Sequence, residues 1–300
     1  TTVIADPHEI ANVCGIPGIE YMLAEALRTP LDILIMLPSC VPATPLDAGG
    51  AVLAADDLAQ FRGREGVIGL AEVMNVPGVL AGDPDLSEKM RLFEIVDGHA
   101  PLLSGADLNA YIYAGVQSDH ESTSHAEAEE KLLRGMYIMI REGSTEQNLQ
   151  NLIGLVDACT AARCCFSTDD RHADMLAREG HIDDCIRRAV SCGLEVEQAI
   201  RMATLSAAER FGLHDRGAIA PGRLADFCVI DNPERFHILR TFKRGVEVVD
   251  PGYRPPVPLT APLRVRLPGP RDIRISGRGE ARVIGIVPGQ IVTRDLRYVV

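Results

Sequence analysis

The chain has 300 residues, of which 46% are hydrophobic and 24% are charged, so it is long enough to bury a substantial core. Its 42 acidic residues outnumber its 30 basic residues, and the net charge of -12 disfavours nucleic-acid binding because such a surface repels phosphate. No apolar run approaches the ~20 residues that a membrane span requires, and no low-complexity tract indicates disorder.

Short runs rich in β-branched and apolar residues alternate with helical patterns along residues 1–211. Seven of these runs are predicted to form strands: 2–5, 31–37, 67–70, 94–96, 115–118, 137–140 and 164–167. Apolar residues at helical spacing predict helices over 107–114, 125–133, 148–159, 182–192 and 196–211, the first of them between the end signals Ser104 and Gly115. Such alternation is typical of a parallel sheet with helical crossovers.

Each predicted strand is followed by residues that can bind a metal or carry a proton. In a β/α-barrel the carboxyl ends of all strands face one mouth, whereas an open doubly wound sheet gathers its chemistry at one switch point. No glycine-rich dinucleotide or phosphate loop follows any strand, so we predict an α/β fold of the (β/α)8 barrel type. Seven strands are one fewer than a closed barrel needs, and the chain starts at Thr1 inside a β-like run. We therefore expect a segment of a longer protein that lacks the first barrel strand.

Four of the strand-end residues form a candidate metal site: Glu72, His99, His120 and Asp169. Imidazole and carboxylate groups are the ligands that a hard or borderline divalent cation takes in proteins. The same side chains could instead make structural hydrogen bonds, and their spacing alone does not decide between the two interpretations.

Two further segments carry polar residues at strand ends. In the segment 6–9, Asp6, His8 and Glu9 could face the mouth, or Asp6 could cap the helix that follows. Glu142 could form an ion pair that supports the site, with Ser144 starting the next helix. The remaining histidines are expected mostly at the surface or behind the site: His125, His172, His181, His214 and His237.

Other side chains indicate how the protein packs or in which cellular compartment it resides, and not a catalytic role. Asn109, Tyr111 and Tyr113 share helical spacing and are expected to pack. The eight cysteines contain no C-x-x-C pair, which favours buried free thiols over disulfides or a zinc-thiolate site. No signal peptide is visible, so we expect a cytoplasmic protein.

The pattern changes after residue 213. Runs at 225–230, 282–286 and 291–293 are predicted to be strands, the last two around a Pro288-Gly289 turn. Residues 251–270 are proline-rich without helical periodicity, and they are expected to form a linker or an extended edge segment.

Taken together, these motifs resemble a known family. The stretches TTVIADPHEIANV, LPSCVPATPL, GLAEVMNVPGVL, DGHAPLLSGADLNAYIYAG, SDHES, GMYIMIREGS, STDDRH, EGHID, GAIAPGRLADF and RVIGIVPGQIVT make the chain similar to bacterial-type adenine deaminases of the amidohydrolase superfamily. The resemblance extends over essentially the whole chain. None of the motifs would suffice singly.

The resemblance implies a fold and a reaction. It implies an amidohydrolase barrel over 1–213, return strands of a β-sandwich domain over 214–250, and a linker with the start of a C-terminal domain over 251–300. It also implies hydrolytic deamination of adenine to hypoxanthine and ammonia, as in purine salvage, by a metal-activated hydroxide that attacks C6. The expected cofactor is a pair of divalent metals, manganese or iron. The expected partner is the small purine base, and the acidic surface neither requires nor excludes a homodimer.

The resemblance also implies residue roles. Glu72, His99, His120 and Asp169 correspond to metal ligands of the family, with Asp169 taking the proton of water and Glu72 bridging the metals or sharing in proton transfer. The residues expected to bind the base or support the ligands are His8, Glu9, Glu142, Ser144 and Asp170. The H-x-H pair of the family has no counterpart in the chain. The alternatives are an amidohydrolase that opens a cyclic amide, although no lysine stands at a strand end, and a non-catalytic barrel.

Overall fold

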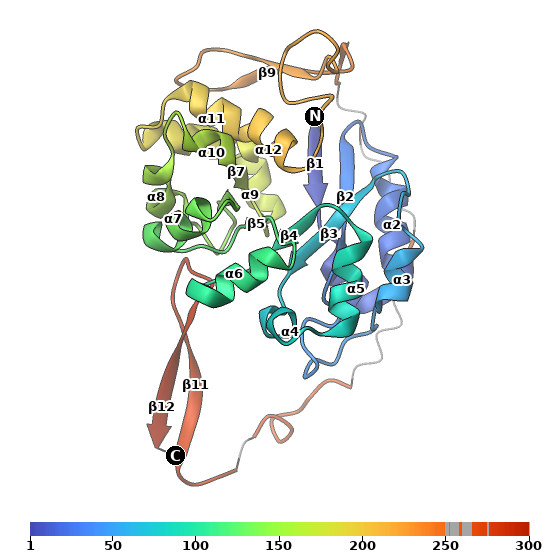
Figure 1. Cartoon of the computed structure of the whole chain (residues 1–300), viewed down its shortest axis with the longest axis vertical. Helices are drawn as coiled ribbons and strands as arrows, with labels where there is room; N and C mark the ends of the chain where they lie inside the picture. Colours follow the sequence, from blue (N-terminus) through green and yellow to red (C-terminus); the bar gives the residue numbers. More distant parts are fainter. Residues whose placement is uncertain (250–251, 253–257, 260–265, 275, 300) are drawn as a thin grey trace.

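The centre of the molecule consists of parallel strands that follow one another in chain order (Figure 1). The computed structural model describes residues 1–249, 252, 258–259, 266–274 and 276–299. One sheet contains β1 (Thr2–Ala5), β2 (Asp32–Pro38), β3 (Val67–Val73) and β4 (Val96–Gly98), and a second contains β5 (Ser118–Asp119), β6 (Tyr137–Arg141) and β7 (Cys164–Ser167). The Gln117 N–H donates to the Val96 carbonyl at 3.2 Å and joins the two sheets. A strand forms near each of the seven predicted runs, although β4 and β5 overlap the predicted runs 94–96 and 115–118 at one residue each. The α/β fold is confirmed.

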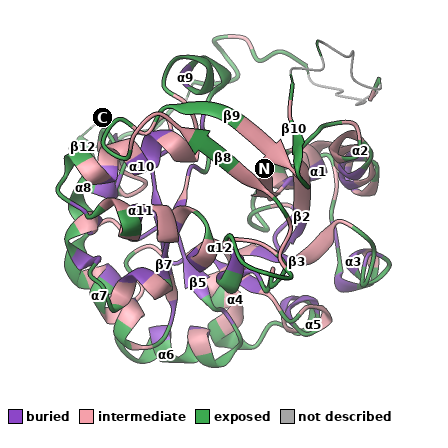
Figure 2. Ribbon diagram, turned by 90° about the horizontal axis from the view of Figure 1, so that it is seen from above, coloured by how far each residue is buried: buried purple, intermediate pink, exposed green. Residues whose placement is uncertain are grey.

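Helices surround these strands on the outside (Figure 2). They are α1 (His8–Cys14), α2 (Ile16–Ala26), α3 (Ala55–Ala59), α4 (Val76–Ala81), α5 (Pro84–Leu92), α6 (Gly105–Tyr113), α7 (His125–Leu133), α8 (Leu149–Leu152), α9 (Ala173–Arg178), α10 (Ile182–Ser191), α11 (Val196–Ala203) and α12 (Leu205–Arg210). Strands joined by such crossovers bury both faces of the sheet. The polar residues at the carboxyl ends of the strands are therefore left at one end of the molecule.

Two of the predicted helices are wrong in extent. The helix expected over 148–159 is only α8 followed by one 3-10 turn at Ile153–Leu155. It ends where Val156 adopts extended backbone angles of φ -92 and ψ 119. Beyond that residue the Asp157 carboxylate accepts the N–H groups of Cys159 and Thr160, both at 2.8 Å, and so stabilises a separate turn. The helix expected over 196–211 divides into α11 and α12 at Thr204, whose backbone angles of φ -131 and ψ -84 are not helical.

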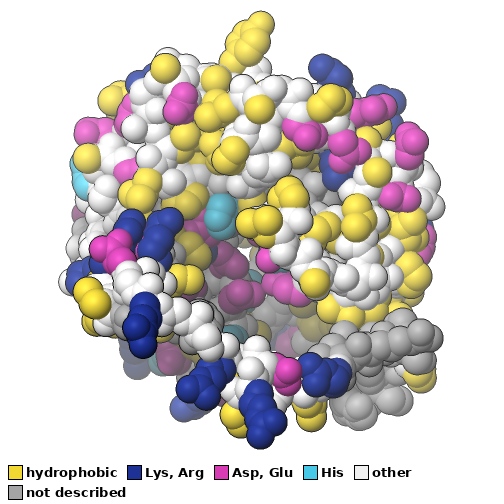
Figure 3. Space-filling model, turned by 90° about the horizontal axis from the view of Figure 1, so that it is seen from below, with side chains coloured by type: hydrophobic (Ala, Val, Ile, Leu, Met, Phe, Trp, Pro, Cys, Tyr) yellow, Lys and Arg dark blue, Asp and Glu magenta, His cyan; other side chains and the backbone are white. Residues whose placement is uncertain are grey.

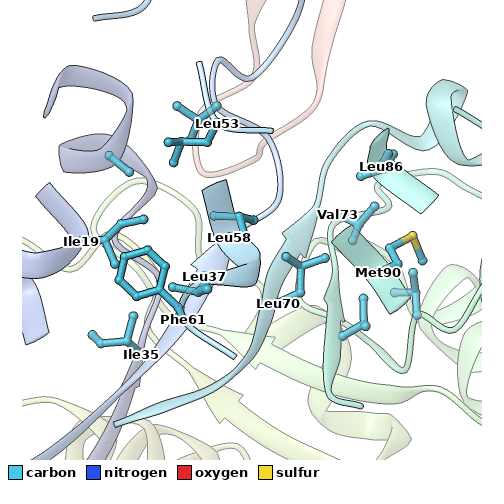
Figure 4. Close-up of a cluster of buried hydrophobic side chains, with 14 of the residues drawn as sticks. Ile19, Ile35, Leu37, Leu53, Leu58, Phe61, Leu70, Val73, Leu86 and Met90 are labelled. Atoms are coloured by element: carbon cyan, nitrogen blue, oxygen red, sulfur yellow. The ribbon is translucent and has the colours of Figure 1, made fainter. Parts of the chain in front are cut away.

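The strand residues alternate between two apolar layers. Ile35 and Leu37 of β2 point outward into a core with Phe61 and Leu70, shown in Figure 4, whereas Met36 between them packs at the centre of the barrel. The same alternation recurs on β6 and β7, where the outward residues pack against α8, α10 and α11. This period of two is what a strand between a helical shell and a barrel interior requires.

Antiparallel strands follow the barrel. A sheet of β8 (Phe227–Ile230), β9 (Ile238–Lys243) and β10 (Val246–Glu247) lies at the amino ends of the barrel strands, where Lys243 contacts Asp32 (Figures 1 and 2). A hairpin joins β11 (Glu280–Ile286) to β12 (Thr293–Val299). The strand predicted over 291–293 is wrong, because pairing with β11 places β12 over Thr293–Val299. The predicted linker 251–270 falls largely outside the described residues, and the domain boundaries stay a prediction.

The cysteines are all free, but burial divides them. Cys40, Cys164, Cys165 and Cys185 are buried as predicted, and Cys14 is half-buried. The prediction is wrong for three cysteines that lie in a turn, at a helix end and on an outer strand face: Cys159, Cys192 and Cys228 are exposed.

Within the described ranges, no helix is both long enough and apolar enough to cross a bilayer.

Candidate active site

Glu72, His99 and His120 meet at the carboxyl ends of three neighbouring strands. Glu72 lies in β3, His99 directly follows β4 and His120 directly follows β5. The Glu72 Oε2 atom lies 2.8 Å from His99 Nδ1 and 3.0 Å from His120 Nε2. Acidic and histidine side chains gather in the hollow at this end of the molecule (Figure 3). The structure therefore brings three of the four predicted ligands into contact.

Glu121 completes this group, although the sequence analysis did not single it out. Its Oε1 atom lies 3.5 Å from His99 Nδ1 and 3.4 Å from His120 Nε2. The ligand atoms of Glu72, His99, His120 and Glu121 all lie within 4.8 Å of one another. The available signal was its position next to His120 in the SDHE motif.

A second group shares Glu72 with the first. The Asp6 Oδ2 atom lies 2.9 Å from His8 Nδ1, and the same nitrogen lies 3.3 Å from Glu72 Oε1. Glu72 therefore presents one oxygen to each group. The capping interpretation of Asp6 is wrong, because Pro7 occupies the N-cap of α1 and no side chain caps that helix. Glu9 remains largely exposed beside His8, with its Oε1 atom 3.2 Å from His8 Nε2.

The buried charges of these two groups shift each other's ionisation. Burial favours the neutral form of Glu72, yet the hydrogen bonds with His120 and His99 hold its pKa well below the usual range. Burial raises the pKa of Asp6 to about 7. Burial alone would lower the pKa of His8, but the hydrogen bond with Asp6 raises it to about 9. The site thus gathers several buried carboxylates, whose negative charge favours a positively charged partner.

Asp169 lies beside the first group rather than inside it. Its Oδ2 atom is 3.8 Å from His120 Nε2 and accepts a hydrogen bond from Arg141 Nη1. The same Nη1 atom donates to Glu121 Oε1, so that one guanidinium binds both carboxylates. Asp169 has a left-handed φ of 48°, which is strained for a residue with a side chain. Its Oδ1 atom accepts the N–H of Asp170 at 2.8 Å.

Two of the predicted residues lie behind the mouth. Glu142 is buried; its Oε1 atom accepts the Leu149 N–H at 2.9 Å and its Oε2 atom lies 3.4 Å from Arg188 Nη1. The Ser144 hydroxyl accepts the His172 N–H at 2.8 Å. Both side chains therefore bind neighbouring loops, and neither joins the histidine cluster.

A cavity of about 1110 Å³ opens onto the cluster. Its polar wall and its apolar wall are formed by different sets of residues. The polar side includes Asp6, His8, Glu9, Glu72, Asp97, His120, Asp169 and Asp170, and the apolar side includes Met36, Met139, Cys165, Phe166 and Phe211. Such a mixture of apolar walls and few convergent polar groups is typical of a small-molecule site.

One histidine of the cavity was not singled out from the sequence. His181 is half-buried and lines the cavity, with its Nε2 atom 3.0 Å from the Thr168 hydroxyl. Burial lowers its pKa, which favours the neutral imidazole. The loop that follows β7 brings it inward, and no periodic pattern in the sequence indicates that contact. The other four remaining histidines, His125, His172, His214 and His237, are exposed as expected.

The donor atoms of the cluster fit a divalent cation. Two imidazoles and two carboxylates converge, and neither Glu121 Oε2 nor Asp6 Oδ1, both buried, has a hydrogen-bond partner among the described residues. A buried carboxylate oxygen without a partner is costly, and a bound cation would remove that cost.

Comparisons with known proteins agree with this geometry. The model of the amidohydrolase family matches residues 1–249. The curated adenine deaminase of Methanoculleus marisnigri is 80% identical over 298 residues, which are 99% of this chain and 58% of that protein. The adenine deaminase of Methanoregula boonei is 60% identical over 301 residues, covering 99% of this chain and 54% of that protein. The chain thus spans about half the length of the curated relatives that it matches.

Solved structures share the fold at low identity. A β-aspartyl dipeptidase from Fervidobacterium islandicum AW-1 aligns with a TM-score of 0.56 at 19% identity, over 82% of this chain and 73% of that one. An N-acetyl-D-glucosamine-6-phosphate deacetylase from Mycobacterium smegmatis aligns with a TM-score of 0.56 at 15% identity, over 83% of this chain and 74% of that one. At such identities the likeness concerns the fold alone.

Proposed function

The chain belongs to the amidohydrolase family, and we propose that its function is the hydrolytic deamination of adenine to hypoxanthine and ammonia. The observation that carries this proposal is the cluster at the strand ends. One carboxylate oxygen of Glu72 contacts His99 and His120, and the other contacts His8, which is bound to Asp6. The two relatives that are 80% and 60% identical are both named adenine deaminases, which supports the choice of substrate.

The proposed cofactor is a pair of manganese or iron ions. Glu72, His99, His120 and Asp169 are the proposed ligands, and Glu121 is positioned to join them. A divalent cation bound there would lower the pKa of water and so supply hydroxide near neutral pH.

The chain's own residues would handle the protons. Asp169 accepts the proton of the attacking water at a carboxylate oxygen, while Arg141 compensates its charge. The ring nitrogen of adenine beside C6 must gain a proton to accept the electrons, and the amino group leaves as ammonia once it is protonated. His8, Glu9 and Asp170 line the cavity and would orient the base.

Glu142 and Ser144 would act on the site indirectly. Glu142 binds the start of α8 and Arg188 of α10, and Ser144 joins the loop after β6 to the loop after β7. We also propose a cytoplasmic location, which the eight free cysteines support, since disulfides are typical of oxidising compartments.

The reaction is tested by measuring ammonia release from adenine with the complete, manganese-loaded protein. Asp169→Asn should lower kcat by roughly 100-fold to 10,000-fold, the range for loss of a general acid-base group, while the variant remains folded. The matched control is Asp174→Asn, an exposed aspartate of α9, which should retain the parent rate. Parental turnover by Asp169→Asn would refute the assigned role. Ring opening of cyclic amides without ammonia release from adenine would refute the function.

A further inference from the structure

A fully buried lysine lies directly behind the histidine cluster. Lys131, in α7, has 0% exposure, and its Nζ atom has four oxygen neighbours. These are Ala100 O at 2.6 Å, Glu127 Oε1 at 2.8 Å, Asp119 Oδ2 at 2.9 Å and Ser122 Oγ at 3.0 Å. An ammonium group is rarely buried without such compensation, because desolvation of its charge is costly.

Three of the four neighbours of Lys131 lie next to candidate ligands, and the fourth, Glu127, belongs to α7 itself. Ala100 directly follows His99, whereas Asp119 and Ser122 flank His120 and Glu121. One ammonium group therefore binds the loop after β4 and the loop after β5 at the same time.

Asp119 reinforces the same connection. Its Oδ1 atom accepts the Ala100 N–H at 2.9 Å, and its Oδ2 atom accepts the Glu121 N–H at 3.2 Å and the Ser122 hydroxyl at 2.7 Å. Asp119 is itself fully buried. With Lys131 it forms a closed set of hydrogen bonds that joins the backbone next to His99 to the backbone next to Glu121.

We propose that Lys131 is a positioning residue for the metal site. By joining the two loops, it fixes the distances at which His99, His120 and Glu121 present their ligand atoms to one cation. This inference rests on the proposed metal-dependent function. Groups that orient metal ligands in this way typically change metal affinity 10-fold to 100-fold when they are removed.

A purely structural role makes a different prediction, and two variants separate the two roles. Lys131→Met leaves the buried charge of Asp119 without its partner, so either role predicts a loss of thermal stability. Lys131→Met combined with Asp119→Asn removes the fully buried ion pair, and the remaining carboxylate of Glu127 keeps the N–H groups of Leu102 and Thr123 as partners. A structural role then predicts that stability and metal affinity recover together. A positioning role predicts that stability recovers while affinity stays low, because the bridge from Ala100 O to the loop after β5 is still absent.

The experiment is a calorimetric titration of the complete protein with Mn²⁺, together with thermal melting. We expect the parent to bind Mn²⁺ and both Lys131 variants to bind it 10-fold to 100-fold more weakly. The matched control is Lys243→Met, which removes an ammonium from Asp32 and Asp226 at the opposite end of the strands and should bind as the parent does.

Each outcome decides the proposal. Affinity of the double variant within threefold of the parent would overturn the positioning role, as would an equal loss of affinity in Lys243→Met. A parent that binds no Mn²⁺ would overturn the proposed metal-dependent function itself, and the positioning role with it. If Lys131→Met alone does not fold, the double variant decides the question.

Discussion

The buried side chain of Tyr111 hydrogen-bonds to the backbone beside the candidate site. The helical spacing predicted that Asn109, Tyr111 and Tyr113 pack, but only Tyr111 is buried. Its hydroxyl donates to the Val73 carbonyl at 2.7 Å and accepts the His99 N–H at 3.1 Å. The helical spacing could identify the helix face that includes Tyr111, but not the backbone groups of Val73 and His99 to which its hydroxyl is bonded.

Tyr111→Phe should therefore destabilise the protein by about 1–3 kcal/mol, because it leaves a buried N–H and a buried carbonyl without a partner. Urea unfolding followed by circular dichroism measures this loss. Tyr113→Phe is the matched control, since Tyr113 is 94% exposed, and it should unfold as the parent does. Equal stability of the two variants would refute the role of the hydroxyl.

Thiol reactivity also follows from burial of single residues. Burial raises the pKa values of Cys164, Cys165 and Cys185 to about 12, so their reactive thiolate forms are scarce near pH 8. In Ellman's assay at pH 8, we expect these three thiols to react only after unfolding. The exposed thiols Cys159, Cys192 and Cys228 should react at once. Rapid labelling of Cys165 in the folded protein, detected by mass spectrometry, would contradict this expectation.

At the scale of elements, β4 and β5 approach each other so closely that β4 must end in glycine. A Cβ atom added to Gly98 would lie 2.4 Å from the Ser118 carbonyl oxygen and 2.5 Å from Val116 Cγ1. Since His99 directly follows Gly98, any displacement of β4 would also move a candidate metal ligand.

Gly98→Ala should thus cost about 1–3 kcal/mol of unfolding free energy, as overpacking typically does. It should also weaken Mn²⁺ binding. Both quantities can be measured by chemical unfolding and calorimetry. Gly277→Ala is the control, because a Cβ there meets no atom of the described residues within 4 Å and its φ lies outside the left-handed region. A stable Gly98→Ala variant with parental Mn²⁺ affinity would contradict the proposed close contact.

Asp32, the first residue of β2, links this strand to β9 through Lys243. Burial alone would raise its pKa, but hydrogen bonds and charges from Lys243 and Arg216 outweigh burial and hold the pKa below the usual value. A lowered folded-state pKa gives stability that is fully present above the unfolded-state pKa of about 3.9 and is lost as pH falls through the folded-state value.

Asp32→Asn should accordingly be less stable than the parent at pH 7, by roughly 1–3 kcal/mol, the value of hydrogen bonds to a charged group. The difference should begin to shrink as pH falls below about 4, where the carboxylate of the unfolded parent becomes protonated, and it should be lost as pH falls through the lower folded-state pKa. Unfolding curves at pH 7 and pH 3 measure it. A difference that grows on acidification would refute the assigned ion pairs.

Local sequence patterns predicted which strands and helices form better than they predicted the residues at which those elements begin and end. The strands followed from β-branched runs, because each strand lies between a helical shell and the barrel interior. The helix expected over 148–159 was wrong in extent because the backbone is extended at Val156 and the Asp157 carboxylate then binds the N–H groups of a separate turn. Hydrophobic periodicity depends on which residues are apolar, and it does not indicate where a side chain binds backbone N–H groups.

At the scale of the whole molecule, the parallel order of the strands explains why the candidate ligands meet. Strand-end position predicted Glu72, His99 and His120, because adjacent parallel strands place their carboxyl ends together. Strand-end position also suggested that Asp6 and His8 face the mouth, but it did not indicate Glu121. The contacts of Glu121 with His99 and of His8 with Glu72 depend on how the loops after β5 and β1 turn, which strand periodicity does not determine.

The most direct test of the account is an anomalous diffraction measurement at the manganese absorption edge, on crystals of the complete protein grown with Mn²⁺. We predict an anomalous peak in contact with Glu72, His99 and His120. A peak bound elsewhere, with these three side chains still hydrogen-bonded only to one another, would contradict the assignment of the strand-end cluster as the metal site.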